Sequence, residues 1–334
     1  MTAREIDRLR GPILRSVSRS FYLSLRILPQ PLRDPLSLAY LLARASDTIA
    51  DTPEPPAELR IEALQNLAWA IQGAGPREAA AGIRDSFAPL QRNEAERALI
   101  DELPAVLDWL DLLDEGDRRQ VREVLEKINR GQMLDLERFG VCAGVHALPA
   151  AAALDEYTYL VAGCVGEFWT RLCFAHVQDF CDRHEPAMLA LGVQYGKGLQ
   201  LINILRDAGP DLREGRCYLP ADELDLLGLH PDQVLTNHGR AEPVMQHWRE
   251  KAGRDLAAGL EYACAIRPWR VRLATALPAL IGARTLSLLR AAGPEVFAHK
   301  VKVGRAEVRE ILFSTTLSLA SPHSLRKTFH RLSG

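Results

Sequence analysis

Apolar residues recur at helical spacing along most of this 334-residue chain, and no segment alternates apolar and polar residues as a half-buried strand does. This pattern restricts the fold to packed helices. Helices are predicted over the ranges 35–51, 57–72, 94–112, 117–139, 152–178, 185–208, 242–266, 270–291, 304–314 and 322–333. The loops at 73–76, 140–149 and 209–220 are short, and no linker or repeat divides the chain. We therefore predict one all-α domain over residues 1–334, with its helices around a central cavity.

Composition excludes several classes of protein. An apolar share of 47% can form a sizeable core, while a net charge of −2 gives no general attraction to nucleic acid. The six cysteines form no CxxC pair, which argues against a zinc site or a disulfide scaffold and indicates reduced thiols. The first residues lack the apolar stretch of a signal peptide, and the longest uncharged run, between Arg138 and Asp155, is short and broken by Gly and Pro. We therefore expect a cytoplasmic protein, at most peripheral to the inner face of the cell membrane.

The first candidate metal-binding segment is LLARASDTIADT. Asp47 and Asp51 are four residues apart, so their carboxylates lie on one face of a helix, where like charges repel. Mg²⁺ prefers carboxylate and phosphate oxygens, and Arg44 on the same face could pair with the carboxylates or bind a phosphate. The helix is predicted to begin at Asp34 and Pro35, because Asp caps free amides and Pro suits the first helical position. Taken alone, the aspartate spacing is also typical of a solvated helix end.

A second segment, NILRDAGPD, repeats the four-residue spacing with Asp207 and Asp211. Two independent segments of this kind, each beside an arginine and an apolar wall, favour a functional interpretation. Pro210 lies between the two aspartates and lacks an amide donor, so it should end or kink the helix. We expect Asp211 to lie on a turn, which weakens its role as a metal ligand relative to Asp207.

Polar residues around the second aspartate pair suit a diphosphate. Arg206 and Arg216 carry fixed positive charge that matches its oxygens. Gln200 and Asn203 lie within an apolar, core-like run, where they need hydrogen-bond partners. They either contact a substrate or are core residues satisfied within the protein.

Two further segments carry residues suited to a long apolar substrate. In YTYLVAGCVG, Tyr157 precedes small residues that leave room for either a long chain or a close neighbouring helix. In SRSF, the polar residues Ser18, Arg19 and Ser20 precede Phe21, and they could form either a mobile flap over a phosphate site or a helix cap.

Together these segments resemble the squalene/phytoene synthase family, whose members condense two isoprenoid diphosphates head to head. The resemblance covers nearly the whole chain in the right order. SRSF is similar to the family's flap, DTIAD to its first aspartate-rich motif, and NILRD, continuing to Asp211 and GRCYLP, to its second. YTYLVAG is similar to the segment with the catalytic tyrosine, which places that role on Tyr157. In the second motif, Gly209 and Pro210 stand where squalene synthases tend to have a larger residue and an acid.

Within the family, the DTIAD motif is most similar to that of squalene synthases. HKVKVGRAEV resembles the basic segment that squalene synthases use near NADPH, so Lys300, Lys302 and Arg305 are candidate contacts to its phosphates; a solvated basic turn is the alternative. No counterpart of the C-terminal membrane anchor of eukaryotic squalene synthases follows, which implies a soluble form of the bacterial type.

The resemblance implies an isoprenoid synthase fold and the reaction of a bacterial-type squalene synthase, which supplies a sterol or hopanoid precursor. Two farnesyl diphosphates would give presqualene diphosphate with Mg²⁺, and NADPH would reduce this product to squalene. The implied site comprises metal ligands Asp47, Asp51, Asp207 and Asp211, catalytic residues Tyr157, Arg44 and Arg206, and substrate-binding residues Ser18, Arg19, Ser20, Phe21, Gln200, Asn203 and Arg216. The implied partners are prenyl diphosphates, with peripheral membrane contact for product release and an oligomeric state that the sequence does not determine.

Other reactions stay open. An enzyme that stops at presqualene diphosphate, dehydrosqualene or phytoene would need no reductive step, and no GxGxxG motif follows a strand to indicate a nicotinamide cofactor. A non-catalytic relative acting as a binding or assembly protein would release no diphosphate. A terpene cyclase would not be expected to carry the SRSF and YxxxVAG segments. Neither the prenyl chain length nor the number of metal ions follows from the sequence.

Overall fold

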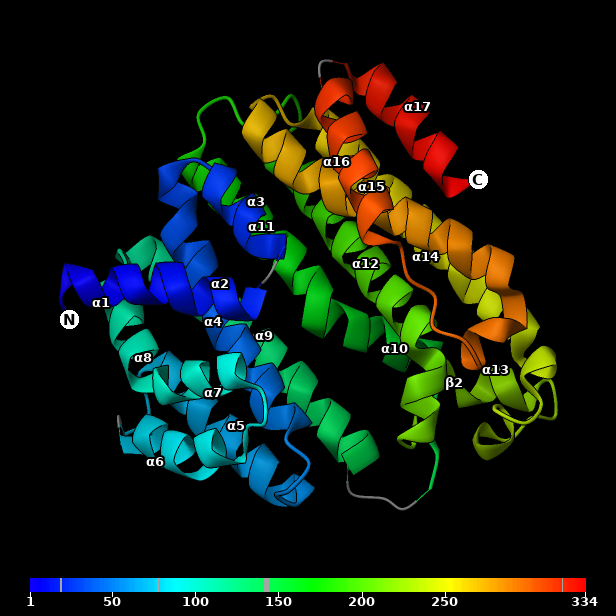
Figure 1. Ribbon diagram of the computed structural model, residues 1–334, viewed down its shortest axis with the longest axis horizontal. Coiled ribbons are helices and arrows are strands. Elements are labelled where there is room, and N and C mark those ends of the chain that lie inside the picture. The colour runs from blue at the N-terminus through cyan, green and yellow to red at the C-terminus, as the bar shows by residue number, and fades with distance from the viewer. Residues whose placement is uncertain (19, 77, 141–143, 320) are drawn as a thin grey trace. The chain divides into compact units, whose positions relative to one another are not determined.

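The computed structural model describes residues 1–18, 20–76, 78–140, 144–319 and 321–334, with the backbone alone for residues 20, 21, 23 and 24. The predicted all-α fold is confirmed, because α-helices form most of these ranges (Figure 1). The chain separates into two compact units, which are described one at a time. Unit 1 comprises Met1–Val141 with Arg171–Val177, and unit 2 comprises Cys142–Thr170 with Gln178–Gly334. A single domain over the whole chain stays a prediction.

Unit 1 is built around one long, mostly buried helix, α4 (Gln30–Asp51), whose apolar residues include the fully buried Leu38, Leu41 and Leu42. Helix α9 packs along it, and α5 packs on both. The other helices of the unit are α1 (Ala3–Arg8), α2 (Leu14–Ser18), α3 (Ser20–Ile27), α5 (Ala57–Gln72), α6 (Glu78–Phe87), α7 (Glu94–Asp101), α8 (Leu103–Leu112) and α9 (Glu115–Asp135), with π-helical turns at Leu9–Ile13 and Leu136–Gly140 and a 3₁₀ turn at Ala88–Leu90.

The predicted start of α4 at Asp34 and Pro35 is wrong by about one turn, because the helix begins at Gln30 after Pro29. Asp34 does not cap an amide: its carboxylate accepts a hydrogen bond from Arg10 at 3.1 Å. Pro35 lies buried inside the helix, which loses one backbone hydrogen bond near its first turn.

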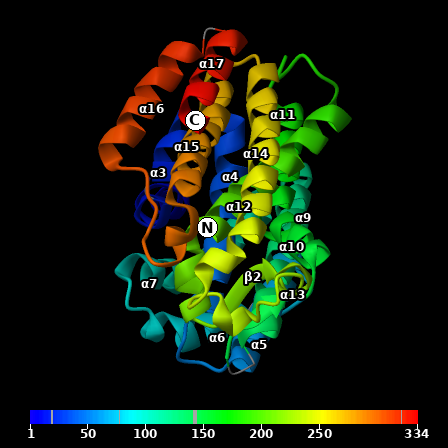
Figure 2. The same cartoon turned by 90° about the vertical axis from the view of Figure 1, so that its right-hand side faces the viewer.

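Unit 2 centres on α12 (Glu185–Arg213), which packs side by side with α14 (Glu242–Ala265) and through it with α15 (Trp269–Ala292) (Figures 1 and 2). Its other elements are β1 (His146–Leu148), α10 (Ala151–Thr158), a π-helical turn (Tyr159–Gly163), the first part of α11 (Cys164–His176), β2 (Arg216–Pro220), α13 (Ala221–Asp225), 3₁₀ turns at Pro231–Gln233, His238–Ala241 and Gly293–Phe297, α16 (Arg305–Ser318) and α17 (Pro322–Ser333).

Small residues let α12 approach the segment from α10 to α11 closely. A Cβ atom on Gly166 would lie 1.9 Å from the carbonyl oxygen of Gly192, and one on Gly196 would lie 2.2 Å from that of Ala162. Backbones this close exclude any side chain between them. The small residues of this segment were predicted to leave room for either a long chain or a close neighbouring helix. At Gly166 the space is taken by the neighbouring helix.

The segments predicted as the loops 140–149 and 209–220 contain two short strands that the sequence pattern missed. β1 and β2 pair in parallel, with His146 opposite Arg216 and Ala147 opposite Cys217. Strands of three and five residues are too short to show a reliable alternation. The pairing fixes β2 beside α10, which positions part of the candidate site.

Among the described residues, the segment Trp269–Phe297 is long and apolar enough to cross a membrane, with a mean hydropathy of 1.2 over its most apolar 18 residues. Of that window, 56% is buried within the protein, as is usual for a core helix. Length and composition alone do not separate these two roles.

Candidate functional site

The first aspartate pair lies at the C-terminal end of α4. Asp51 is the last residue of the helix, and Asp47 lies one turn before it. Thr48, Ile49 and Ala50 between them are buried, whereas Asp47 is half-buried and Asp51 is exposed. Two carboxylates at the negative end of a helix dipole repel each other and the dipole, so this end of α4 favours a bound cation.

Asp47 is held by a glutamine that the sequence analysis did not identify. Gln132 of α9 donates a hydrogen bond from Nε2 to Oδ1 of Asp47 at 2.5 Å. Removal from water and the neighbouring Asp51 raise the pKa of Asp47 to about 7, although Arg44 and the Gln132 hydrogen bond act in the opposite direction. A carboxyl group with this pKa near neutral pH exchanges its proton readily for a metal ion.

Arg44 is paired in this structure, as one of the two predicted roles requires. Its guanidinium contacts Glu96 of α7 and lies 3.9 Å from Oδ2 of Asp47. Glu96 was also missed, because 52 residues separate it from Arg44. The arginine is thus oriented beside the aspartate pair, where an incoming phosphate could exchange with the carboxylates.

The second aspartate pair corrects a prediction. α12 does not end at Pro210 but continues to Arg213, so Asp207 and Asp211 lie one turn apart on the same helix. Pro210 comes three residues before the helix end, where only one backbone hydrogen bond is lost. Gly209 is needed at its position, since a Cβ atom there would lie 2.3 Å from the carbonyl oxygen of Phe297.

Each aspartate of the second pair forms an ion pair with an arginine. Arg206 binds Asp207 at 2.5 Å, and Arg216 binds Asp211 at 3.1 Å and Glu214 at 2.6 Å. Burial raises the pKa of Asp211 to about 6, while Arg216 opposes the rise and Asp207 adds to it. The second pair therefore shares the main features of the first: two acids one turn apart, an arginine contact and a carboxyl group with a raised pKa.

The core-like placement expected for Gln200 and Asn203 is wrong for Asn203, whose side chain is exposed. It lies 3.4 Å from the side-chain oxygen of Gln200, to which its amide donates. Residues 200, 203, 207 and 211 share one face of α12, and the buried leucines and isoleucines occupy the other. Reading this helix at its 3.6-residue period, rather than as a continuous apolar run, would have placed the asparagine correctly.

Tyr157 lies in the same unit as the second pair. It is buried at the end of α10, just before the π-helical turn, and stacks on Tyr218 with ring centroids 5.1 Å apart. Tyr218 belongs to β2 and comes two residues after Arg216. β2 therefore connects the tyrosine stack to the arginine of the second pair. The sequence analysis did not predict this connection because it did not predict the strand.

Other predicted residues are less closely tied to the aspartates. Ser18 is buried, and its hydroxyl donates to the carbonyl oxygen of Leu14 at 2.5 Å. Arg19 lies outside the described residues, as do the side chains of Ser20 and Phe21. Lys300, Lys302 and Arg305 are exposed, the first two in the loop before α16 and the third at its first residue.

The donor set fits Mg²⁺ at each aspartate pair. Across the ranges that the structure describes, no three or more His, Cys, Asp or Glu residues gather as a complete metal site. Mg²⁺ does not require one, because it keeps several waters and takes one or two carboxylates together with substrate phosphates. The exposed basic side chains at residues 300, 302 and 305 likewise suit the phosphates of NADPH.

The comparisons with known proteins agree on one family. The lycopaoctaene synthase of Botryococcus braunii is 28% identical over 92% of this chain and 66% of its own length. The presqualene diphosphate synthase of Rhodopseudomonas palustris is 31% identical over 64% of this chain and 62% of its own length. The chain thus spans about two thirds or less of these relatives.

The fold also has a solved counterpart. A ligand complex of TcSQS has a TM-score of 0.77 and 23% sequence identity, covering 98% of this chain and 91% of that one. A family model described as squalene/phytoene synthase matches residues 14–307. The chain therefore belongs to the squalene/phytoene synthase family.

Proposed function

We propose that the protein is a Mg²⁺-dependent prenyltransferase of the squalene synthase type, which joins two farnesyl diphosphates head to head and reduces the product to squalene. The observation that carries the proposal is the repeated arrangement on α4 and α12, in which two aspartates lie one turn apart with an arginine in contact. Family membership supports the same class of reaction.

The first step needs positive charge around a departing diphosphate. Mg²⁺, when bound by the aspartates, would supply most of this charge. Arg44 in unit 1, and Arg206 and Arg216 in unit 2, already lie beside carboxylates, and each could rotate onto the oxygens of a diphosphate bound at its own aspartate pair, because such oxygens bind guanidinium groups in bidentate fashion. Loss of the diphosphate leaves an allylic cation, which the double bond of the second substrate attacks.

Tyr157 is proposed to help remove the proton whose loss closes the cyclopropane of presqualene diphosphate. Its ring is buried and held by Tyr218, so the hydroxyl is positioned without the mobility of an exposed side chain. NADPH would supply the hydride for reduction to squalene, with Lys300, Lys302 and Arg305 as proposed contacts to its phosphates.

A product assay tests the proposal. The purified protein is incubated with farnesyl diphosphate and Mg²⁺, with and without NADPH, and the extracted products and released diphosphate are measured. We expect presqualene diphosphate without NADPH and squalene with it. Asp47→Ala and Asp207→Ala should each abolish turnover while circular dichroism shows unchanged helical content; near-normal turnover in either variant would refute the metal assignment.

The second candidate function is the same condensation without reduction. The 31% identity to a presqualene diphosphate synthase, over 64% of this chain, supports it. In that case the product is the same whether or not NADPH is present. Repeating the assay with geranylgeranyl diphosphate determines the chain length that the enzyme accepts.

We also propose peripheral membrane contact during release of the apolar product. Helix α16 exposes three large apolar side chains within two turns: Leu312, Phe313 and Leu317. Phe313 and Leu317 are 68% and 67% exposed and lie four residues apart, so they share one face of the helix. In the neighbouring α17, Arg326 is paired with Glu261, whereas Lys327 and Arg331 form no ion pair with a described carboxylate, which suits an anionic bilayer.

A further inference from the structure

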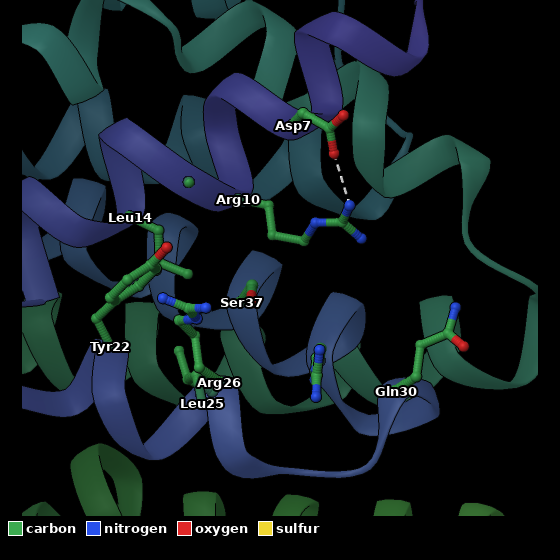
Figure 3. Close-up of a pocket in the computed structure, with 10 residues that line it drawn as sticks. Asp7, Arg10, Leu14, Tyr22, Leu25, Arg26, Gln30 and Ser37 are labelled. Carbon is green, nitrogen blue, oxygen red and sulfur yellow. Dashed lines mark hydrogen bonds and ion pairs between the residues drawn. The ribbon is translucent and has the colours of Figure 1, made fainter.

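A cavity of about 440 Å³ lies among the N-terminal helices of unit 1. It is lined by Asp7, Arg10 and Leu14 of the N-terminal segment and by Tyr22, Leu25 and Arg26 of α3 (Figure 3). The first half of α4 completes the lining. Ser37 on α4 precedes Asp47 by ten residues, or about 15 Å of helix, so the cavity is separate from the first aspartate pair.

Two of the three arginines in this cavity have no acidic partner. Arg10 binds two carboxylates, those of Asp7 at 2.6 Å and Asp34 at 3.1 Å, whose charge together exceeds its own. Arg26 and Arg33 form no ion pair with any carboxylate that the structure describes. The described residues around the cavity therefore comprise three arginines and two carboxylates, an excess of one positive charge, and Arg26 and Arg33 are the arginines available to an anion.

Each of these cations has a contact that orients it, although Arg26 is exposed. Arg33 donates from Nε to the carbonyl oxygen of Leu28 at 2.8 Å, which leaves its terminal nitrogens available. The guanidinium of Arg26 lies over the ring of Tyr22, 6.0 Å from the centroid. Guanidinium groups held in this way can bind the oxygens of one anion at a reduced entropic cost.

A buried hydroxyl also faces the cavity. Ser37 is only 1% exposed and lines the cavity, yet its hydroxyl donates to no described residue. Ser46, further along the same helix, instead donates back to the carbonyl of Leu42 at 3.1 Å. Its oxygen is not one of the described buried polar atoms that lack a partner, so solvent in the cavity can satisfy it, and a bound anion would replace that solvent.

We propose that this cavity binds a phosphate-bearing anion of the diphosphate class, held by Arg26, Arg33 and the Ser37 hydroxyl without a divalent metal. Phosphate oxygens match both the guanidinium groups and the hydroxyl. Leu14 and Leu25 would contact a small organic group attached to the phosphate. The site goes beyond the proposed prenyl transfer and does not depend on it.

The test is calorimetric titration of the full chain with inorganic diphosphate in EDTA, so that metal-dependent binding at the aspartates is absent. Arg26→Gln and Arg33→Gln should each weaken binding by about tenfold, and Ser37→Ala by a few-fold. Arg15→Gln is the matched control: it removes the same charge from exposed α2 outside the cavity and should leave the affinity unchanged.

A second measurement requires no variant. Diphosphate should protect Arg26 and Arg33 of the wild-type protein from phenylglyoxal, as read by peptide mass spectrometry, while Arg15 reacts at its usual rate. Absence of binding in EDTA would overturn the proposal. So would binding that Arg44→Gln or Arg206→Gln removes but the two cavity variants leave intact, since the anion would then occupy the aspartate regions.

Discussion

Asp47 is a half-buried residue whose partial removal from water and whose neighbour Asp51 oppose the stability of the metal-free protein. Its pKa in the folded state is raised to about 7 from an ordinary value of 3.8, so the folded chain binds the proton more tightly than the unfolded chain does. The carboxylate therefore destabilises the fold most above pH 7, and this effect fades as the pH falls toward 4. Functional acids often carry such a cost.

We predict that Asp47→Asn raises the melting temperature of the metal-free protein by roughly 1–3 °C at pH 8, and by less as the pH is lowered. Thermal unfolding in EDTA across this pH range measures the effect. Asp85→Asn, at an exposed acid on α6, should show no such trend. A melting temperature at pH 8 equal to or below that of the wild type would contradict the assigned cause of the pKa shift.

The contact between Gln132 and Asp47 could not be predicted from the sequence. The spacing of Asp47 and Asp51 is visible in one segment, but the glutamine that binds Asp47 is 85 residues away on another helix. Helical periodicity shows which face a residue occupies and does not show which distant helix packs against that face. The aspartates and arginines were therefore predictable, while Gln132, Glu96 and Tyr218 needed the tertiary structure.

We predict that Gln132→Leu weakens Mg²⁺ binding about tenfold at pH 6.5 and less at pH 8.5. Loss of the hydrogen bond raises the pKa of Asp47 further, so protons compete better with the metal at the lower pH. Titration of Mg²⁺ at both pH values provides the measurement. Gln72→Leu, which removes a glutamine that binds the carbonyl of Arg122, is the control with no expected effect on metal affinity.

At the scale of elements, prediction was accurate where local signals decide the outcome. The helix predicted over 57–72 has those bounds in the structure, because Pro56 precedes it and Gly73, with a φ of 73°, ends it. The prediction was wrong where contacts between distant segments determine the structure. α12 tolerates Pro210 near its end, and β2 forms through its pairing with a segment about 70 residues earlier.

Two glycines test how packing overrides helix propensity. Gly209→Ala and Gly82→Ala make the same change within a helix, which by propensity stabilises by about 0.5–1 kcal/mol. At Gly82 of α6 nothing lies within 4 Å of the new Cβ, so we expect that gain. At Gly209 the Cβ would clash with the backbone of Phe297, and we expect a loss of about 2 kcal/mol or more. Chemical denaturation measures both, and a stabilised Gly209→Ala variant would contradict the close approach.

At the scale of the whole molecule, the family could be predicted from the sequence, but the reaction product could not. The fold and the two aspartate pairs, one in each compact unit, were foreseeable because each rests on periodicity and local spacing. The identity of the product was not, because the shape of the substrate site depends on side chains brought together from many helices. The proposed membrane contact was not foreseeable either, because the exposure of an apolar side chain depends on which other segments pack over it.

That surface supports a prediction for the full chain. We expect the protein to sediment with vesicles that contain anionic lipid, and Phe313→Ser with Leu317→Ser to lower the bound fraction about tenfold or more, because burying each such side chain contributes roughly 1.5–3 kcal/mol. Leu226→Ser is the matched control, since Leu226 is 87% exposed but lies after α13 rather than on α16. Added salt should weaken binding if the basic face of α17 takes part. Equal loss of binding in the control would show that general hydrophobicity, and not the α16 face, makes the contact.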